Sequence, residues 1–192
     1  MHLSLIPVDT RDSAVALHGP PAVPWVDEVV IVSSSVIHGR GLFTNADLDA
    51  DRVVIRLGGR LVSSSELERL LDAAPAYVDT VAVYEDVHLV LPTGTTVHYG
   101  NHSCDPNLWH VGPYEIATRR PVRAGEELTV DYGTHSAGAG FSMACACGAS
   151  TCRGAVTSED WRRPELQTAY RGHWAPVLEE RIRRLREAGP ET

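Results

Sequence analysis

The chain has 192 residues, 43% of them hydrophobic, and a formal net charge of -8 at pH 7. This length suits one domain with a sizeable core. The negative charge argues against direct nucleic-acid binding and favours a basic partner, although acidity that only maintains solubility is an equally good explanation.

The basic residues and the N-terminal segment bear on the source and the compartment. All 17 Lys or Arg residues are arginine, a bias typical of GC-rich genomes, which points to a bacterial source. Residues 1–19 lack the apolar core of a signal peptide, and no window approaches the roughly 18 apolar residues of a membrane span. We therefore expect a cytoplasmic protein, with association with the nucleoid left open and no membrane contact.

The chain opens with a proline-rich segment and a first strand. Residues 1–27 lack a sustained period, and we interpret them as a loosely attached lead-in. Residues 29–32 form an apolar run that suits a buried strand. Gly39 and Gly41 follow, where missing side chains let the backbone approach a ligand, although a glycine-containing turn explains the pair equally well.

Short strands separated by turns continue the pattern. Residues 53–57 and 60–62 predict a hairpin around Gly58-Gly59. Ser65 and Glu68 then have capping-box spacing and predict the start of a short helix. Further strands are expected at residues 80–84, 87–91, 95–99, 109–111, 114–118 and 128–132. Many short strands with few helices predict a mainly β domain of small sheets.

The C-terminal part predicts a linker and then helices. Residues 133–140 are rich in Gly, Ala, Ser and Thr, which is typical of a linker. Residues 158–187 have a helical pattern in which Pro164 and Pro176 suit first-turn positions. The apolar residues expected to share one helix face are Leu178, Ile182 and Leu185.

The cysteines have a spacing suited to a metal. They are Cys104, Cys145, Cys147 and Cys152. In a reducing compartment cysteines are ligands or thiols before they are disulfides. Four thiolates satisfy a tetrahedral Zn²⁺ completely, so such a site would be structural. A set of free thiols or a disulfide remains the alternative.

A polar loop carries the most specific sequence signal. Asn101 and His102 place an amide and an imidazole side by side in a segment that Gly100 and Pro106 prevent from being a regular helix. In isolation such a pair is typical of a turn whose side chains bond their own backbone. The loop reads Asn101-His102-Ser103-Cys104-Asp105-Pro106-Asn107, and some two dozen residues later the chain reads Gly125-Glu126-Glu127-Leu128-Thr129-Val130-Asp131-Tyr132.

These two runs resemble the signature motifs of the SET-domain protein methyltransferases. The Gly-x-Gly before them and the Cys-x-Cys-x4-Cys tail after them stand where that family carries a cofactor contact and its post-SET motif, so the resemblance covers roughly residues 28 to 155. It implies a SET-domain, β-clip-like fold of small sheets with short helices and a knot-like C-terminal segment. The implied divisions are a lead-in at 1–27, the SET domain at 28–134, a post-SET zinc-binding segment at 135–157 and a C-terminal helical tail at 158–192.

The resemblance also implies roles for individual residues. Tyr132 matches the catalytic tyrosine of the family. The residues that match or adjoin its S-adenosylmethionine contacts are Arg40, Gly41, Tyr99, Asn101 and His102. The ligands implied for a structural Zn²⁺ are Cys104, Cys145, Cys147 and Cys152. The run His98-Tyr99-Gly100 departs from the Arg-Phe and bulky aliphatic residue often found there, and the neighbours of Tyr132 leave the number of methyl groups added unpredictable.

The implied function is S-adenosylmethionine-dependent methylation of a lysine side chain. In-line transfer needs donor and acceptor aligned and the amine uncharged, which a narrow, partly dry channel favours. The acidic chain points to a basic protein substrate, such as a DNA-associated or ribosomal protein, and to no direct nucleic-acid binding. The competing interpretation is a SET-like zinc-containing binding module with weak turnover. A purely structural zinc protein would leave Asn101, His102 and Tyr132 without a purpose.

Overall fold

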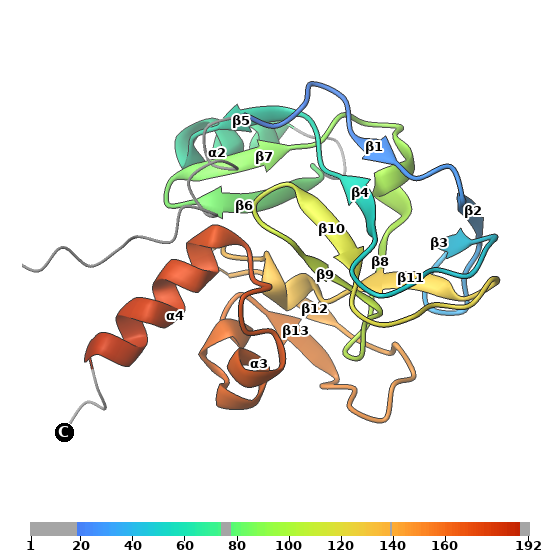
Figure 1. Ribbon diagram of the computed structural model, residues 1–192. Helices are drawn as coiled ribbons and strands as arrows, with labels where there is room; N and C mark the ends of the chain where they lie inside the picture. The colour runs from blue at the N-terminus through green and yellow to red at the C-terminus, as the bar shows by residue number, and fades with distance from the viewer. Residues whose placement is uncertain (1–18, 74–77, 139, 189–192) are drawn as a thin grey trace, which may run out of the picture.

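The computed structural model describes residues 19–73, 78–138 and 140–188, which form small β-sheets with few short helices (Figure 1). The expectation of a mainly β protein is confirmed. None of the helices in the described ranges combines the length and apolar composition needed to cross a membrane.

Two four-stranded sheets position the site. The first contains, in order of pairing, β1 (Trp25–Val26), β4 (Val53–Arg56), β10 (Glu115–Thr118) and β9 (Leu108–His110). The second contains β2 (Val30–Ser34), β3 (Arg40–Thr44), β11 (Glu127–Val130) and β8 (Asn101–His102). All pairs are antiparallel except β8 with β11, which is parallel.

Two smaller sheets complete the β structure. One contains β5 (Arg60–Val62), β7 (Val87–Val90) and β6 (Thr80–Tyr84), and the other contains β12 (Ser142–Ala144) and β13 (Ala155–Thr157). The β6–β7 hairpin turns at Asp86, whose φ of 57° lies in the left-handed region, as the tight connection requires. The strands of this hairpin and of the β9–β10 hairpin were expected from the sequence.

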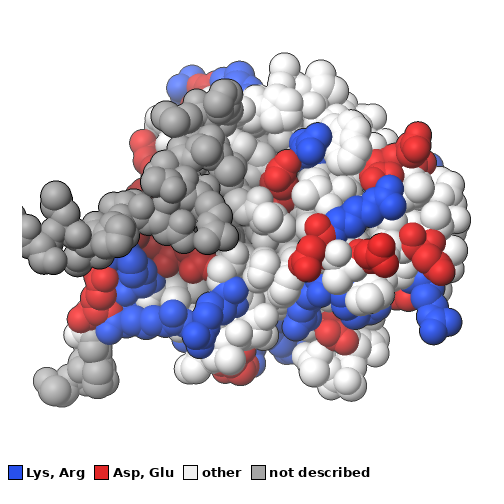
Figure 2. All heavy atoms as spheres, viewed as in Figure 1, with Lys and Arg blue, Asp and Glu red and all other residues white. Residues whose placement is uncertain are grey.

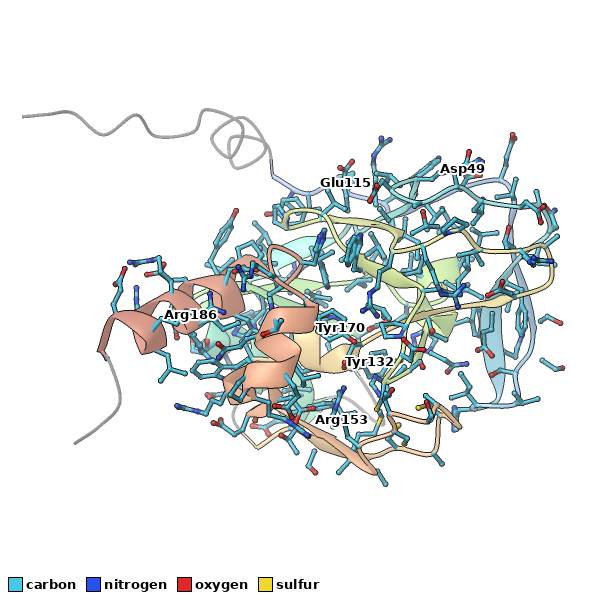
Figure 3. The ribbon with its side chains drawn as sticks, turned by 60° about the horizontal axis from the view of Figure 1, so that its bottom comes forward. Asp49, Glu115, Tyr132, Arg153, Tyr170 and Arg186 are labelled. Carbon is cyan, nitrogen blue, oxygen red and sulfur yellow. The ribbon has the colours of Figure 1, made fainter. Side chains whose placement is uncertain are left out.

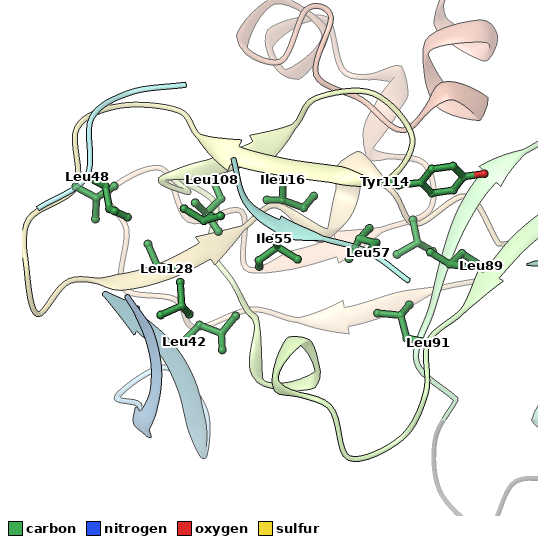
Figure 4. Packing of buried hydrophobic residues seen from close by; sticks show 14 of the residues in the cluster. Leu42, Leu48, Ile55, Leu57, Leu89, Leu91, Leu108, Tyr114, Ile116 and Leu128 are labelled. Atoms are coloured by element: carbon green, nitrogen blue, oxygen red, sulfur yellow. The ribbon is translucent and has the colours of Figure 1, made fainter. Parts of the chain in front are cut away.

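The main hydrophobic core lies where the three larger sheets meet. Figure 4 shows Leu42 and Leu128 of the second sheet near Ile55 and Leu108 of the first, with Leu89 of the third sheet farther along the same cluster. Each of these side chains is buried. At about 25 cal/mol per Å² of apolar surface removed from water, this burial is the dominant favourable term of the fold.

The predicted hairpin around Gly58-Gly59 is wrong. Strand β4 pairs with β1 and β10, whereas β5 pairs with β7 in another sheet. The two glycines instead allow neighbouring segments to pack close to the chain. A side chain on Gly58 would overlap the backbone of Val23, and a side chain on Gly59 would overlap the carbonyl oxygen of Val90. Part of the proposed lead-in is likewise integral to a sheet, since Trp25 and Val26 pair with β4.

The strand expected at residues 95–99 is also wrong. Thr96–Tyr99 form a 3₁₀ helix, η1, in which the N–H groups of His98 and Gly100 donate to the carbonyls three residues earlier. His98 and Tyr99 therefore lie on a helical turn rather than on a strand leading into the Asn101 loop.

Helix α2 (Ser64–Ala73) begins slightly earlier than the predicted capping box. Ser63 Oγ accepts the N–H of Glu66 at 3.3 Å, so Ser63 and Glu66 occupy the positions assigned to Ser65 and Glu68. The sequence also predicts that this helix ends at Pro75, a position outside the described residues.

The C-terminal helices enclose a second core. Helices α3 (Pro164–Ala169) and α4 (Pro176–Ala188) begin at the two predicted prolines, and the 3₁₀ helix η3 (Asp160–Arg162) precedes them. The buried residues of this core include Ala82 of β6 together with Trp161, Tyr170, Trp174, Leu178 and Ile182. Leu185, predicted to share the buried face, is 37% exposed.

Candidate functional site

Strand pairing brings the sequence motifs to one end of the second sheet. Leu128 of β11 lies opposite Leu42 of β3, so β11 runs beside the Gly-x-Gly segment. On its other side, Thr129 lies opposite Asn101 and Val130 opposite His102 in the parallel pair with β8. Segments far apart in the sequence therefore surround Tyr132, which lies just after β11.

Asn101 braces the loop between β2 and β3. Its side-chain nitrogen donates to the carbonyl oxygens of His38 and Arg40 at 3.2 and 3.0 Å and to Glu127 Oε1 at 2.8 Å. A side chain on Gly41 would overlap that Glu127 carboxylate. The missing Cβ of Gly41 is thus needed for the approach of Glu127 and Asn101, a role that the sequence did not reveal.

Arg40 and Tyr99 form a contact at the surface beside this brace. The guanidinium carbon lies 4.5 Å from the centre of the Tyr99 ring, and Nη1 donates to the tyrosine hydroxyl at 3.3 Å. The pairing fixes two of the residues assigned to the cofactor, although they come from β3 and η1.

The buried His102 ring links Tyr132 to the cysteines. Its Nδ1 accepts the backbone N–H of Tyr132 at 3.1 Å, so Nδ1 carries no hydrogen. The ring hydrogen is then on Nε2, which lies 3.3 Å from Cys104 Sγ and donates to it. Burial lowers the pKa of His102, which agrees with this neutral tautomer.

Tyr132 lies in the wall of a cavity of about 720 Å³. Strand β11 ends at Val130, so the predicted strand 128–132 is two residues too long, and Tyr132 begins the 3₁₀ helix η2 (Tyr132–Thr134). Its hydroxyl donates to the carbonyl oxygen of Gly100 at 2.6 Å. Most of the cavity wall is apolar, so a side chain entering it leaves most of its water behind.

Two histidines that the sequence reasoning missed share this wall. His110 Nε2 lies 3.1 Å from His135 Nδ1, and the His135 ring centre is 5.7 Å from that of Tyr132. Burial lowers the pKa of His135 to about 4 and that of His110 well below its usual value. The wall beside Tyr132 therefore stays uncharged at neutral pH. Residues so far apart along an irregular fold give no local signal for this pairing.

The four cysteines form one cluster of free thiols. Their sulfur atoms all lie within 4.8 Å of one another, with Cys104 and Cys152 at 3.8 and 3.7 Å from Cys145. A tetrahedral Zn²⁺ with bonds of about 2.3 Å requires sulfur separations of about 3.8 Å, so the arrangement fits this ion. Burial opposes ionisation of Cys147, yet N–H donors from Cys104 and Ala149 lower its pKa to about 6, which favours the ligating thiolate.

Comparison with known proteins identifies the class. Residues 39–133 match the family described as SET domain. Residues 39–133 of this chain therefore form a SET domain, and the SET-domain fold predicted from the sequence is confirmed.

Several curated proteins are similar over the same region. Human "Histone-lysine N-methyltransferase 2B" is 37% identical over 139 residues, which cover 66% of this chain and 5% of that protein. "Histone-lysine N-methyltransferase trithorax" of Drosophila virilis is 34% identical over 142 residues, which cover 66% of this chain and 4% of that protein. The chain thus spans only a small part of the length of these two relatives.

A solved structure supports the fold independently. The crystal structure of the methyltransferase domain of human Histone-lysine N-methyltransferase SETMAR has a TM-score of 0.52, with 22% sequence identity. The match covers 65% of this chain and 56% of that one. At this identity the likeness bears on the fold alone.

Proposed function

We propose that the protein transfers the methyl group of S-adenosylmethionine to a lysine side chain of a protein substrate. The observation that carries this proposal is the position of Tyr132, whose hydroxyl is held 2.6 Å from the Gly100 carbonyl at the wall of a largely apolar cavity. The SET domain at residues 39–133 and the names of the similar proteins support the reaction type.

The cofactor would be held at the end of the second sheet by Arg40, Gly41, Tyr99, Asn101 and His102. Bound S-adenosylmethionine would supply a methyl group activated by its sulfonium charge. The chain itself orients the acceptor: Tyr132 and the Gly100 carbonyl present polar atoms at the wall, while the surrounding side chains exclude water. Burial disfavours the ammonium form of a lysine, so the cavity favours the uncharged amine.

The cysteine cluster would hold a structural Zn²⁺. With four sulfur ligands the ion has no open coordination position and takes no part in transfer. Cys104 lies in the Asn101 loop, and the other three ligands lie between β12 and β13. The ion would therefore fasten residues 145–152 to the loop that carries Asn101 and His102.

For the substrate, charge favours a basic protein, such as a DNA-associated, ribosomal or histone-like protein. The net charge of -8 opposes nucleic acid as a direct partner, and on the face shown in Figure 2 acidic and basic side chains are intermixed. We place this activity in the cytoplasm, at or near the nucleoid if the substrate is DNA-associated.

Calorimetric titration of zinc-loaded protein with S-adenosylmethionine tests the cofactor assignment. We expect saturable binding that Asn101→Ala abolishes, because the Asn101 brace closes the loop beside Gly41. Asn45→Ala, at an exposed position at the end of β3, is the matched control and should bind normally. Near-UV circular dichroism verifies that both variants are folded.

Tyr132→Phe separates catalysis from binding. With radiolabelled S-adenosylmethionine and basic proteins as acceptors, we expect methyl transfer to fall by about 100-fold or more, while cofactor binding persists. No cofactor binding by the folded wild type would contradict the enzyme proposal and favour a zinc-containing binding module.

A further inference from the structure

A buried ionic cluster joins the C-terminal segments to the residue before Tyr132. Both terminal nitrogens of Arg153 donate to the Asp131 carboxylate at 2.7 Å, and Nη2 lies 3.0 Å from Asp160 Oδ2. These side chains are between 1% and 6% exposed. A two-pronged pair between guanidinium and carboxylate fixes orientation as well as distance, which a lysine cannot do.

Tyr170 adds a third C-terminal segment to this cluster. Burial and the neighbouring Asp131 carboxylate raise the pKa of its hydroxyl. Figure 3 shows Tyr132, Arg153 and Tyr170 in one region, between the C-terminal helices and the loop that carries the sulfur atoms. The loop before β13 and the end of α3 therefore reach Asp131 directly, and the helix η3 joins the cluster through the pair between Asp160 and Arg153.

Asp131 in turn sets the local structure of Tyr132. Its Oδ1 accepts the N–H of Gly133 at 3.0 Å, and its carbonyl oxygen accepts the Thr134 hydroxyl at 2.7 Å. It is thus the N-cap of η2, the short helix that begins with Tyr132. A displaced Asp131 side chain would release this turn and with it the direction of the Tyr132 ring.

Arg153 also contacts the cysteine cluster through its backbone. It follows Cys152 directly, and its N–H donates to Cys104 Sγ at 3.4 Å. The backbone of this residue therefore touches the metal-binding cluster, while its side chain holds the cap of η2.

We propose that Arg153 is a positioning residue that couples docking of the cysteine-bearing tail to the orientation of Tyr132. The Tyr132 hydroxyl then points at Gly100 only when Arg153 is paired with Asp131. The catalytic meaning of this coupling rests on the proposed function, but the coupling itself is a property of the folded chain.

The test is fluorine NMR of protein in which all tyrosines, 6 in the chain, are replaced by 3-fluorotyrosine. The Tyr132 resonance is assigned as the one missing in Tyr132→Phe. We expect Arg153→Gln and Arg153→Lys, each with zinc content matched to the wild type, to shift or broaden this resonance. Arg162→Gln, which removes an exposed arginine paired with Glu159, is the matched control and should leave it unchanged.

Enzyme kinetics provide a second test of the proposal. With methyl transfer established, we expect kcat of Arg153→Lys to fall by about tenfold or more while KM for S-adenosylmethionine changes by less than about twofold.

A Tyr132 resonance unaltered in folded Arg153→Gln or Arg153→Lys would overturn the proposal. If the wild type transfers no methyl group, the proposed function fails, while the resonance still decides whether Arg153 positions Tyr132. Arg153→Lys, which keeps the charge, serves where Arg153→Gln does not fold.

Discussion

At the scale of the residue, the site depends on how closely β3 and β11 approach at Gly41. The Glu127 carboxylate occupies the space in which a Cβ would lie, where it accepts from Asn101 at 2.8 Å and from Ser35 Oγ at 2.8 Å. One missing side chain thus permits a bridge between three segments. Packing inside the protein therefore explains why glycine is needed at position 41, independently of any ligand.

We predict that Gly41→Ala lowers the free energy of unfolding by about 1–3 kcal/mol, because the added methyl group must displace the Glu127 bridge. Gly138→Ala is the control: within the described residues, a methyl group added at Gly138 would meet no other atom within 4 Å. A change within about 0.5 kcal/mol is therefore expected for it. Urea denaturation measures both. Equal stability of the two variants would contradict the packing role.

At the scale of the element, β9 and the segment after η2 meet through two histidines. His110 on β9 is fully buried, and within the described part of the chain its Nδ1 has no hydrogen-bond partner. The carbonyl oxygen of His110 accepts from His173 Nδ1 at 2.8 Å, which joins the loop between α3 and α4 to the same place. Protonation of this pair would put an uncompensated charge between packed elements.

The low pKa of His135 predicts that the free energy of unfolding decreases as the pH is lowered. The folded pKa of His135 is about 4, below the roughly 6.5 of an unfolded chain, so the unfolded state binds more protons between these values. The stabilisation of the folded state by uncharged His135 is complete above about pH 6.5 and is lost as the pH falls towards 4. We expect the free energy of unfolding to be about 2 kcal/mol lower at pH 5 than at pH 7 from His135 alone.

Urea denaturation at both pH values measures this difference. His135→Gln should reduce it, whereas His38→Gln, at an exposed position, should not. Zinc occupancy is followed with an indicator dye, because acid also protonates thiolate ligands. An unchanged pH dependence in His135→Gln would show that another group is responsible.

The elements show what could be predicted from the sequence. The β6–β7 and β9–β10 hairpins were predictable because turn residues and alternation are local signals. The separation of β4 from β5 was not, because each strand pairs with a partner distant in sequence. The motif residues around Tyr132 could be named from their resemblance, but Arg153, His110 and His135 act through contacts that only the folded chain creates.

At the scale of the whole molecule, α4 connects the C-terminal segment to the third sheet. Leu178 and Ile182 pack in the second core with Ala82 of β6, next to the strand hairpin that borders the cavity. The contact includes an ion pair between Arg181 and Glu85, which is exposed and contributes little. Apolar burial therefore holds this helix in place.

We predict that Ile182→Ala lowers the free energy of unfolding by about 2–4 kcal/mol, because it leaves a cavity in the second core. Leu185→Ala, about one turn later on the same helix and 37% exposed, should cost clearly less. Thermal and urea unfolding of the two variants provide the comparison. A similar loss for both would place the buried face of α4 differently.

The cluster in which Arg153 and Tyr170 contact Asp131, and Asp160 pairs with Arg153, has a consequence for biosynthesis. During translation the strands of the three larger sheets and Tyr132 are made before any of these three partners. The nascent chain can therefore form its main hydrophobic core while the turn at Tyr132 still lacks the contacts that Arg153 and Tyr170 make with Asp131. The tyrosine acquires its final surroundings only when the last segments fold back onto it, so assembly of the site is among the late events of folding.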